Sequence, residues 1–300
     1  MDTWDTKKPN KPGPKTCQCG PEPDNLPLDT LFPRHRYQRR PSRSAGVAWP
    51  DQRPYRRDYD HLTARQRIDG VNVAGAGAEL LEAADIDYCL ADPTANPPVA
   101  GFPVQVQDVA DAVRALSKPG FDGGRVNVDP SRVAVWGGSA GATLAAETGV
   151  TLGSTGATPV AAMVGWSGGY DFLDFRDSNA QAEKDAQAFL GCDPQTDKSA
   201  ICQSQAREGS AALKVTATTP PMSLWNSSDE LVPITQWQDM KKALTAAHIP
   251  SSPHELIGHL HSNAYTHQAF CPTVTFLTSY LGPYTGTCVA PPNPSGTGAG

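Results

Sequence analysis

The chain lacks any long hydrophobic run. No stretch of about 18 apolar residues occurs in its 300 residues, which excludes a membrane-spanning helix. The first residues include lysines but no apolar segment follows them, so no secretory signal is visible. Internal repeats are also absent, and charged residues make up only 19% of the chain. The hydrophobic fraction of 39% is nevertheless sufficient for an ordinary globular protein.

Charge and proline are spread unevenly along the chain. Residues 1–70 hold 14 basic and 9 acidic side chains, whereas the rest of the chain holds 11 basic and 22 acidic ones. The arginines from Arg34 to Arg67 are interleaved with prolines rather than set on one helix face, so we predict no nucleic-acid partner. We expect a basic Pro/Arg-rich region (1–70) that is poorly ordered or divergent, a folded domain (71–282) and a flexible tail (283–300).

The seven cysteines point to two local bridges and to no metal site. Cys17 and Cys19 lie in a Pro/Gly-rich stretch, without a Cys or His partner at zinc-finger spacing. Four others pair naturally by position. These pairs are Cys192–Cys202 and Cys271–Cys288. Two such bridges would indicate an oxidising, extracytoplasmic compartment, and the alternative is that the four are reduced, partly buried thiols.

Beyond residue 71, short apolar runs alternate with amphipathic segments. This alternation is typical of βα units, in which a mostly parallel sheet is flanked by helices. We predict strands at 83–88, 132–136, 160–166, 221–225 and 254–257. We predict helices at 103–117, directly after 141, at 235–248 and at 265–281. The fold class is therefore α/β, with an atypical N-terminal part.

The clearest chemical motif is G-x-S-x-G at Gly137, Ser139 and Gly141, between the strand RVAVW and the helix-forming ATLAAE. Glycines on both sides of a serine allow a strained strand-to-helix turn that lifts the hydroxyl above the sheet. The pentapeptide alone is common in Gly-rich turns, and its alternative meaning is a structural Gly/Ser turn. Its position between a strand and a helix favours a nucleophilic serine.

A serine hydroxyl needs a base, and the base needs an orienting carboxylate. The loop NSSDELVP (226–233) follows the strand at 221–225 and carries carboxylates. The loop GHLHSN (258–263) follows the strand at 254–257 and carries His259 and His261. Both loops come after Ser139, in the chain order Ser, acid, His that is typical of this arrangement.

In these motifs the chain resembles the α/β-hydrolase superfamily, in particular bacterial carboxylesterases and lipases of the hormone-sensitive-lipase-like and feruloyl-esterase-like groups. The matching stretches are FPVQVQDVADAVRAL, VDPSRVAVWGGSAGAT, FLGC, NSSDELVP and ELIGHLHSNAY. Together they cover about residues 83–282, or two-thirds of the chain. The resemblance implies an α/β-hydrolase domain at 71–282 and a cofactor-free serine hydrolase.

The resemblance also implies roles for individual residues. It makes Ser139 the nucleophile, Asp229 the acid of a D-x-x-V-P loop, and His261 the base of a G-x-x-H loop. Asp171 in WSGGYD is the alternative acid, and His259 is the alternative base. Trp166 and Tyr170, which follow a strand of the sheet, are candidates for lining the substrate pocket or for the core.

The chain departs from this family where the second donor of an oxyanion hole should stand. Relatives carry a His-Gly-Gly-Gly-Trp loop there, whereas this chain has only Ala45–Trp49 as a faint counterpart. The Ala140 N–H would then hold the oxyanion, with Gly46 as the candidate second donor. Loss of one donor typically costs about 10²–10³ in rate. One hypothesis is that part of residues 1–82 is not in the ancestral reading frame, and another is a divergent N-terminus.

These observations favour a serine hydrolase that cleaves carboxylic esters of small molecules through a Ser-His-Asp triad and an acyl-enzyme. The alternative is a catalytically impaired or non-catalytic hydrolase-fold protein without a complete oxyanion hole. A serine peptidase is less favoured, because the length leaves no room for a gating domain. The acyl and alcohol groups, the oligomeric state and the compartment are left open by the sequence.

Overall fold

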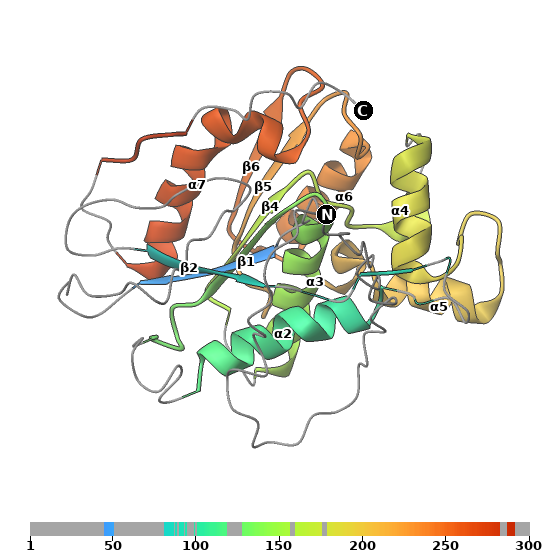
Figure 1. The fold of residues 1–300 in the computed structure, drawn as a ribbon, viewed down its shortest axis with the longest axis horizontal. Coiled ribbons are helices and arrows are strands. Elements are labelled where there is room, and N and C mark those ends of the chain that lie inside the picture. The colour runs from blue at the N-terminus through green and yellow to red at the C-terminus, as the bar shows by residue number, and fades with distance from the viewer. Residues whose placement is uncertain are drawn as a thin grey trace, which may run out of the picture. The chain divides into compact units, whose positions relative to one another are not determined.

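The computed structural model describes residues 45–50, 81–86, 88, 90–92, 94, 99, 101–118, 128–156, 160–175, 179–282 and 287–291. Six strands form one sheet in the order β2-β1-β3-β4-β5-β6 (Figure 1). The strands are β1 (Ala45–Pro50), β2 (Leu81–Ile86), β3 (Ala134–Gly138), β4 (Ala162–Trp166), β5 (Met222–Ser227) and β6 (Ser251–Leu256). Strands β3 to β6 are parallel, and β1 runs antiparallel to both of its neighbours.

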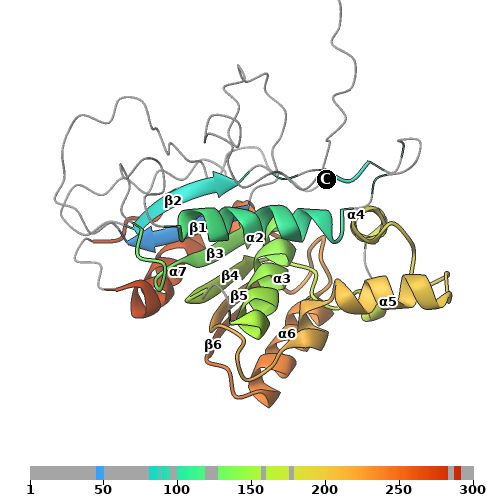
Figure 2. The same cartoon turned by 90° about the horizontal axis from the view of Figure 1, so that it is seen from below.

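Helices cover both faces of the sheet (Figure 2). The helices are α2 (Val104–Leu116), α3 (Ala140–Thr155), α4 (Ala180–Leu190), α5 (Ala200–Glu208), α6 (Ile234–Ala246) and α7 (Thr266–Leu281). Short 3₁₀ turns are η2 (Phe172–Asp174), η3 (Ala211–Lys214) and η4 (Ser262–Tyr265). Helices α2, α3 and α6 lie on one face of the sheet and α7 lies on the other. Helices α4 and α5 lie on the same side as α3, farther from the sheet.

Alternation along β3 explains why both faces need a cover. The Val135 side chain belongs to the apolar cluster under α2, α3 and α6, whereas Ala134 and Trp136 belong to the cluster under α7. Successive strand side chains point to opposite faces, so a strand that is apolar at every position must be buried on both sides. The run AVW at 134–136 is such a strand, and its residues are at most 3% exposed.

The mostly parallel sheet flanked by helices that the sequence predicts is confirmed. Strand β1 and helices α4 and α5 were not among the predicted elements. The domain limits at residues 70 and 282 remain predictions, because most of the first 80 residues lie outside the described part. The hypothesis of a changed reading frame falls on the same residues. None of the described helices is long and apolar enough to span a membrane.

Both cysteine pairs predicted by position are disulfides. Cys192–Cys202 joins the end of α4 to α5, and Cys271–Cys288 joins α7 to the described segment 287–291. Each bridge closes a short loop, with sequence separations of 10 and 17 residues. The bridges therefore fix local geometry at two separate places in the fold.

Candidate active site

Ser139 occupies a sharp turn between β3 and α3. Its backbone has φ 53° and ψ −122°, in the positive-φ region that residues with a Cβ rarely adopt. The Ser139 N–H donates to the carbonyl of Trp166 at 2.7 Å, which ties the turn to the end of the neighbouring strand β4. This is the strand-to-helix turn that the G-x-S-x-G motif predicts, and strain of this kind is typical of functional sites.

The glycines of the motif are needed for close approach. A Cβ at Gly137 would lie 2.1 Å from the carbonyl carbon of Gly141, in the first turn of α3. A Cβ at Gly138 would lie 2.2 Å from Oγ of Ser262, in the loop that follows β6. Both distances are far below van der Waals contact, so a side chain at Gly137 would displace the first turn of α3, and one at Gly138 would displace the Ser262 hydroxyl.

His261 lies beside Ser139. Its Nε2 is 2.9 Å from the Ser139 Oγ, and its side chain is 24% exposed. The residue stands directly before η4, at the end of the loop that follows β6. His259, the alternative base, is exposed on the same loop. Of the two histidines, His261 is therefore the one in hydrogen-bonding contact with the serine.

The acid that contacts His261 is Glu230, and the expectation for Asp229 was wrong. Nδ1 of His261 makes a hydrogen bond to Oε2 of Glu230, whose side chain is fully buried. The Asp229 side chain is exposed, and its N–H donates to the carbonyl of Gly258 at 2.9 Å. Because adjacent residues in the turn after β5 point in different directions, only one of the two carboxylates can face the histidine. The longer Glu side chain does so.

Asp171, the other candidate acid, has a local structural role. Its carboxylate accepts a hydrogen bond from the Leu173 N–H at 2.9 Å and so caps η2. Burial raises the pKa of this carboxyl, since desolvation disfavours the charged form. The hydrogen bonds that lead from Ser139 through His261 to Glu230 do not include Asp171.

The acid loop and the base loop are joined by several hydrogen bonds. The Ser227 Oγ donates to the carbonyl of Leu260 at 2.6 Å, and the Ser228 N–H donates to the carbonyl of Leu256 at 2.8 Å. Oε1 of Glu230 accepts from the Ser227 N–H at 2.9 Å and from the Ser167 Oγ at 2.8 Å. Two donors therefore hold Oε1 of the carboxylate, while Oε2 contacts His261.

A cavity of about 420 Å³ opens beside Ser139. Its wall is mainly apolar and includes Ile86, Phe172, Phe175, Phe189, Leu231 and Val232. Helix α4 supplies one side of it, mostly through alanines and Phe189. A concave, largely apolar site with a few polar groups is the usual form of a small-molecule pocket. Its size falls within the usual range of about 300–1,000 Å³.

Trp166 and Tyr170, the sequence candidates for this wall, lie in the core instead. Trp166 is 2% exposed, stacks edge-on against Trp136 and donates its indole N–H to the Thr273 Oγ1 at 3.1 Å. Tyr170 is 1% exposed, and its hydroxyl lies over Gly165 of β4. A position at the end of a strand does not distinguish a core residue from a cavity residue, because helices cover both faces of this sheet. The aromatic residues that line the cavity, on η2 and α4, were not identified from the sequence.

The segment 169–175 of the cavity wall is held by a buried glutamine. Oε1 of Gln236 accepts from the N–H groups of Tyr170 and Asp171 at 2.8 and 2.7 Å. Its Nε2 donates to the carbonyls of Asp171 and Asp174, both at 3.0 Å. Gln236 is fully buried in α6, and all four hydrogen-bonding positions of its amide are used.

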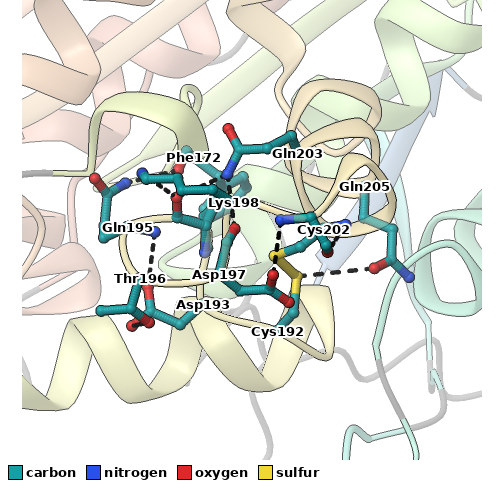
Figure 3. Close-up of a disulfide and its surroundings, with 12 residues drawn as sticks. Phe172, Cys192, Asp193, Gln195, Thr196, Asp197, Lys198, Cys202, Gln203 and Gln205 are labelled. Atoms are coloured by element: carbon teal, nitrogen blue, oxygen red, sulfur yellow. Dashed lines mark hydrogen bonds between the residues drawn. A yellow bond between two sulfur atoms is a disulfide. The ribbon is translucent and has the colours of Figure 1, made fainter.

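The loop closed by the Cys192–Cys202 disulfide holds the same segment from the other side (Figure 3). Nε2 of Gln195 donates to the carbonyls of Phe172 and Leu173, both at 3.3 Å. Nε2 of Gln203 fixes this loop through the carbonyls of Pro194 and Asp197, at 2.8 and 2.9 Å. Figure 3 shows Gln195 reaching Phe172 across the loop.

The expected oxyanion donors differ in their placement. Ala140 is the first residue of α3, so its N–H has no acceptor within the helix and lies next to Ser139. Gly46 lies within β1, paired in register with Asp85 of β2 and Trp136 of β3. Its peptide group is thus part of the sheet, opposite a residue that stands three positions before Ser139, and its role as a second donor stays a prediction. The following residues 51–80 lie outside the described part.

One more buried carboxyl lies on α3, the helix that follows Ser139. Glu147 of α3 is fully buried and forms an ion pair with Lys214 of η3. Burial raises the pKa of Glu147 to about 7, against the opposing effect of the lysine. In the described part of the chain, no three His, Cys, Asp or Glu side chains are grouped so that they could hold a metal ion.

Comparison with known proteins agrees with this architecture. The sequence profile of the BD-FAE family matches residues 81–244, which is more than half of the chain. The chain belongs to the BD-FAE family. No curated protein gives a significant match to this BD-FAE chain.

Several solved structures are similar to this chain. A truncated carbohydrate esterase from gut microbiota is 21% identical with a TM-score of 0.54, over 66% of this chain and 74% of that one. An acetyl ester-xyloside bifunctional hydrolase from Caldicellulosiruptor lactoaceticus is 20% identical with a TM-score of 0.49, over 68% and 72%. The BD-FAE chain therefore has the α/β-hydrolase fold that the sequence motifs predicted.

Proposed function

We propose that the protein is a serine hydrolase that cleaves carboxylic esters through Ser139, His261 and Glu230. The observation that carries the proposal is the continuous hydrogen-bonded chain from the Ser139 Oγ through both ring nitrogens of His261 to a buried carboxylate. A serine on a strained elbow, a base at 2.9 Å and an acid behind that base are the parts that acyl transfer requires.

The first half-reaction follows from this geometry. With its Nδ1–H directed to Glu230, His261 presents Nε2 as an acceptor, so it can take the Ser139 proton as Oγ attacks the ester carbonyl carbon. The buried carboxylate stabilises the imidazolium that forms. His261 then gives this proton to the departing alkoxide, and the ester bond breaks to leave Ser139 acylated.

The second half-reaction uses the same groups. Water enters beside the acyl group, His261 accepts its proton, and the hydroxide attacks the acyl carbonyl carbon. Collapse of this second tetrahedral intermediate breaks the bond to Oγ, and His261 returns the proton to Ser139. The acid product leaves, and the enzyme is restored without a cofactor.

The Ala140 N–H is the donor that stabilises the oxyanion in both steps. It lies at the N-terminus of the 16-residue helix α3, where the aligned peptide dipoles favour negative charge. One N–H at such a position contributes about 10²–10³ in rate. The largely apolar cavity beside it suits an uncharged acyl or aryl group rather than a charged peptide.

Hydrolysis of short p-nitrophenyl esters tests the proposal. The wild-type protein should release p-nitrophenol, and Ser139→Ala should reduce kcat by about 10⁴-fold or more. A fluorophosphonate should add its mass to the wild-type chain and not to the variant. Circular dichroism of the variant checks that it is folded. Equal turnover by both proteins, without labelling of the wild type, would show that Ser139 is not a nucleophile.

A further inference from the structure

Ser167 lies at the centre of the site although it touches neither the Ser139 nor the His261 side chain. It follows β4 directly, is fully buried, and has a backbone φ of 59°. Its N–H donates to the carbonyl of Trp225 at 2.8 Å, which fixes the backbone in this unfavourable conformation. A strained residue that is neither glycine nor exposed suggests a function for its side chain.

The hydroxyl of Ser167 has three partners, and their chemistry decides the direction of each hydrogen bond. Oε1 of the Glu230 carboxylate only accepts, so the single Ser167 proton is donated to it, at 2.8 Å. The Ser262 N–H only donates, to the Ser167 Oγ at 2.9 Å. The Tyr265 hydroxyl, at 2.7 Å, then donates to the Ser167 Oγ, and the Trp225 carbonyl, at 3.3 Å, is a second and longer acceptor for the same proton. The Ser167 oxygen thus has one donated and two accepted hydrogen bonds, which is its full capacity.

These contacts join the acid to the base through one atom. Ser262 directly follows His261 and has a positive φ of 51°. Its N–H is held by the same oxygen that donates to Glu230. A shift of the Ser167 Oγ would therefore move the carboxylate and the backbone next to His261 together.

We propose that Ser167 is a positioning residue for ester hydrolysis, which fixes the Glu230 carboxylate and the backbone of His261 relative to each other. This inference rests on the proposed function for its kinetic consequences, but the placement of the histidine can be measured without turnover. Neither the G-x-S-x-G motif nor the loops 226–233 and 258–263 include this residue.

Two substitutions separate the hydroxyl from the backbone. Ser167→Ala removes the hydroxyl and keeps the strain of a positive φ, whereas Ser167→Gly removes the hydroxyl and relieves the strain. If the hydroxyl positions the acid, both variants should lose kcat by about tenfold, the size of one hydrogen bond to a charged group, with KM within twofold. Ser223→Ala removes another buried serine hydroxyl, bonded to Trp225 Nε1, and serves as the control with unchanged kcat.

A pH profile gives a readout that a purely structural residue would not change. When Oε1 of Glu230 loses one of its two donors, the carboxylate keeps more negative charge, so the acidic limb of kcat/KM should shift upward in pH. Tyr170 and Tyr265 do not titrate in this range, because burial and the charge of Glu230 raise the pKa of each.

The pKa of the His261 ring should also be measured by NMR, in Ser139→Ala and in Ser139→Ala with Ser167→Ala. An upward shift caused by Ser167→Ala supports the inference, even if the wild type hydrolyses no ester and the proposed function fails. An unchanged pKa together with unchanged kcat in both Ser167 variants overturns it. A loss of kcat in Ser167→Ala that Ser167→Gly restores also overturns it, because strain and not the hydroxyl would then be responsible.

Discussion

The loops that carry the reacting groups and the wall of the cavity are held by different means. The reaction loops (137–141, 226–230 and 258–262) are joined to each other by backbone and hydroxyl hydrogen bonds, and two serines there have positive φ. The cavity wall (169–175 with α4) is held by the amides of Gln236 and Gln195 and by a disulfide. In the proposed reaction, the first region positions Ser139, His261 and Glu230, and the second determines the shape of the substrate cavity.

This difference predicts a division of effects. Substitutions in the reaction loops should act on kcat, because they disturb groups that take part in the transition state. Substitutions behind the cavity wall should act on KM and on stability, because they change the shape of the binding surface. A substitution behind the wall that changed kcat alone would contradict the comparison.

The largest effect is expected at the acid. Glu230→Gln keeps the shape of the side chain but removes the charge that supports the His261 imidazolium, so kcat should fall by about 10⁴-fold. Asp229→Asn, one residue away and exposed, should stay within twofold of the wild type. Steady-state kinetics with a p-nitrophenyl ester measures both. A larger loss for Asp229→Asn would restore the acid that the D-x-x-V-P motif predicted.

The next effect is expected behind the cavity wall. Gln236→Glu retains the acceptor for Tyr170 and Asp171 but places a carboxylate oxygen against two carbonyls in a buried site. We expect a loss of about 3 kcal/mol in unfolding free energy and a several-fold rise in KM. Urea unfolding and steady-state kinetics measure the two effects. Gln238→Glu, exposed on the same helix, should change neither.

Glu147 and Lys214 join the two regions, since α3 carries the elbow and η3 follows α5. The pKa of Glu147 is raised from an ordinary 4.5 to about 7, so the folded state binds this proton more tightly than the unfolded chain does. Stability from this group is full below pH 4.5 and is lost as pH rises through about 7. Relative to Glu147→Gln, the wild type should lose about 3 kcal/mol across this window.

Urea unfolding of both proteins at several pH values measures this difference. The exposed Glu255→Gln serves as the control, and its difference from the wild type should stay constant with pH. Because Glu147 touches none of the reacting groups, kcat should not follow the change in stability. A Glu147→Gln difference that is flat between pH 4 and 8 would contradict the prediction.

A small effect on activity is expected at the first of the two disulfides. Replacing Cys192 and Cys202 by serine frees the loop of Gln195, so KM should rise a few-fold while stability falls by about 2–3 kcal/mol. Replacing Cys271 and Cys288 removes a bridge of similar span at α7, on the other face of the sheet from α3. This second pair of substitutions should cost similar stability, by thermal unfolding, with KM unchanged. Equal changes in KM would show that the first loop does not shape the cavity.

The sequence was informative wherever local pattern alone decides the structure. The strand–elbow–helix at Ser139 and the parallel strands follow from apolar runs and from glycine spacing. The acid was misassigned because neighbouring residues of one turn, Asp229 and Glu230, differ only in direction, and that direction depends on hydrogen bonds to the loop after β6. Helices α4 and α5 are short and polar, with few buried residues, so their periodicity is weak.

The two glycines before Ser139 limit what may replace them by volume and not by chemistry. A methyl group at Gly137 would have to displace backbone in the first turn of α3, whereas one at Gly138 would have to displace only the Ser262 hydroxyl. Alanine at Gly137 should therefore already be harmful, and more so than alanine at Gly138. A single added carbon atom at Gly137 would thus be enough to disturb the turn that carries Ser139, the proposed nucleophile.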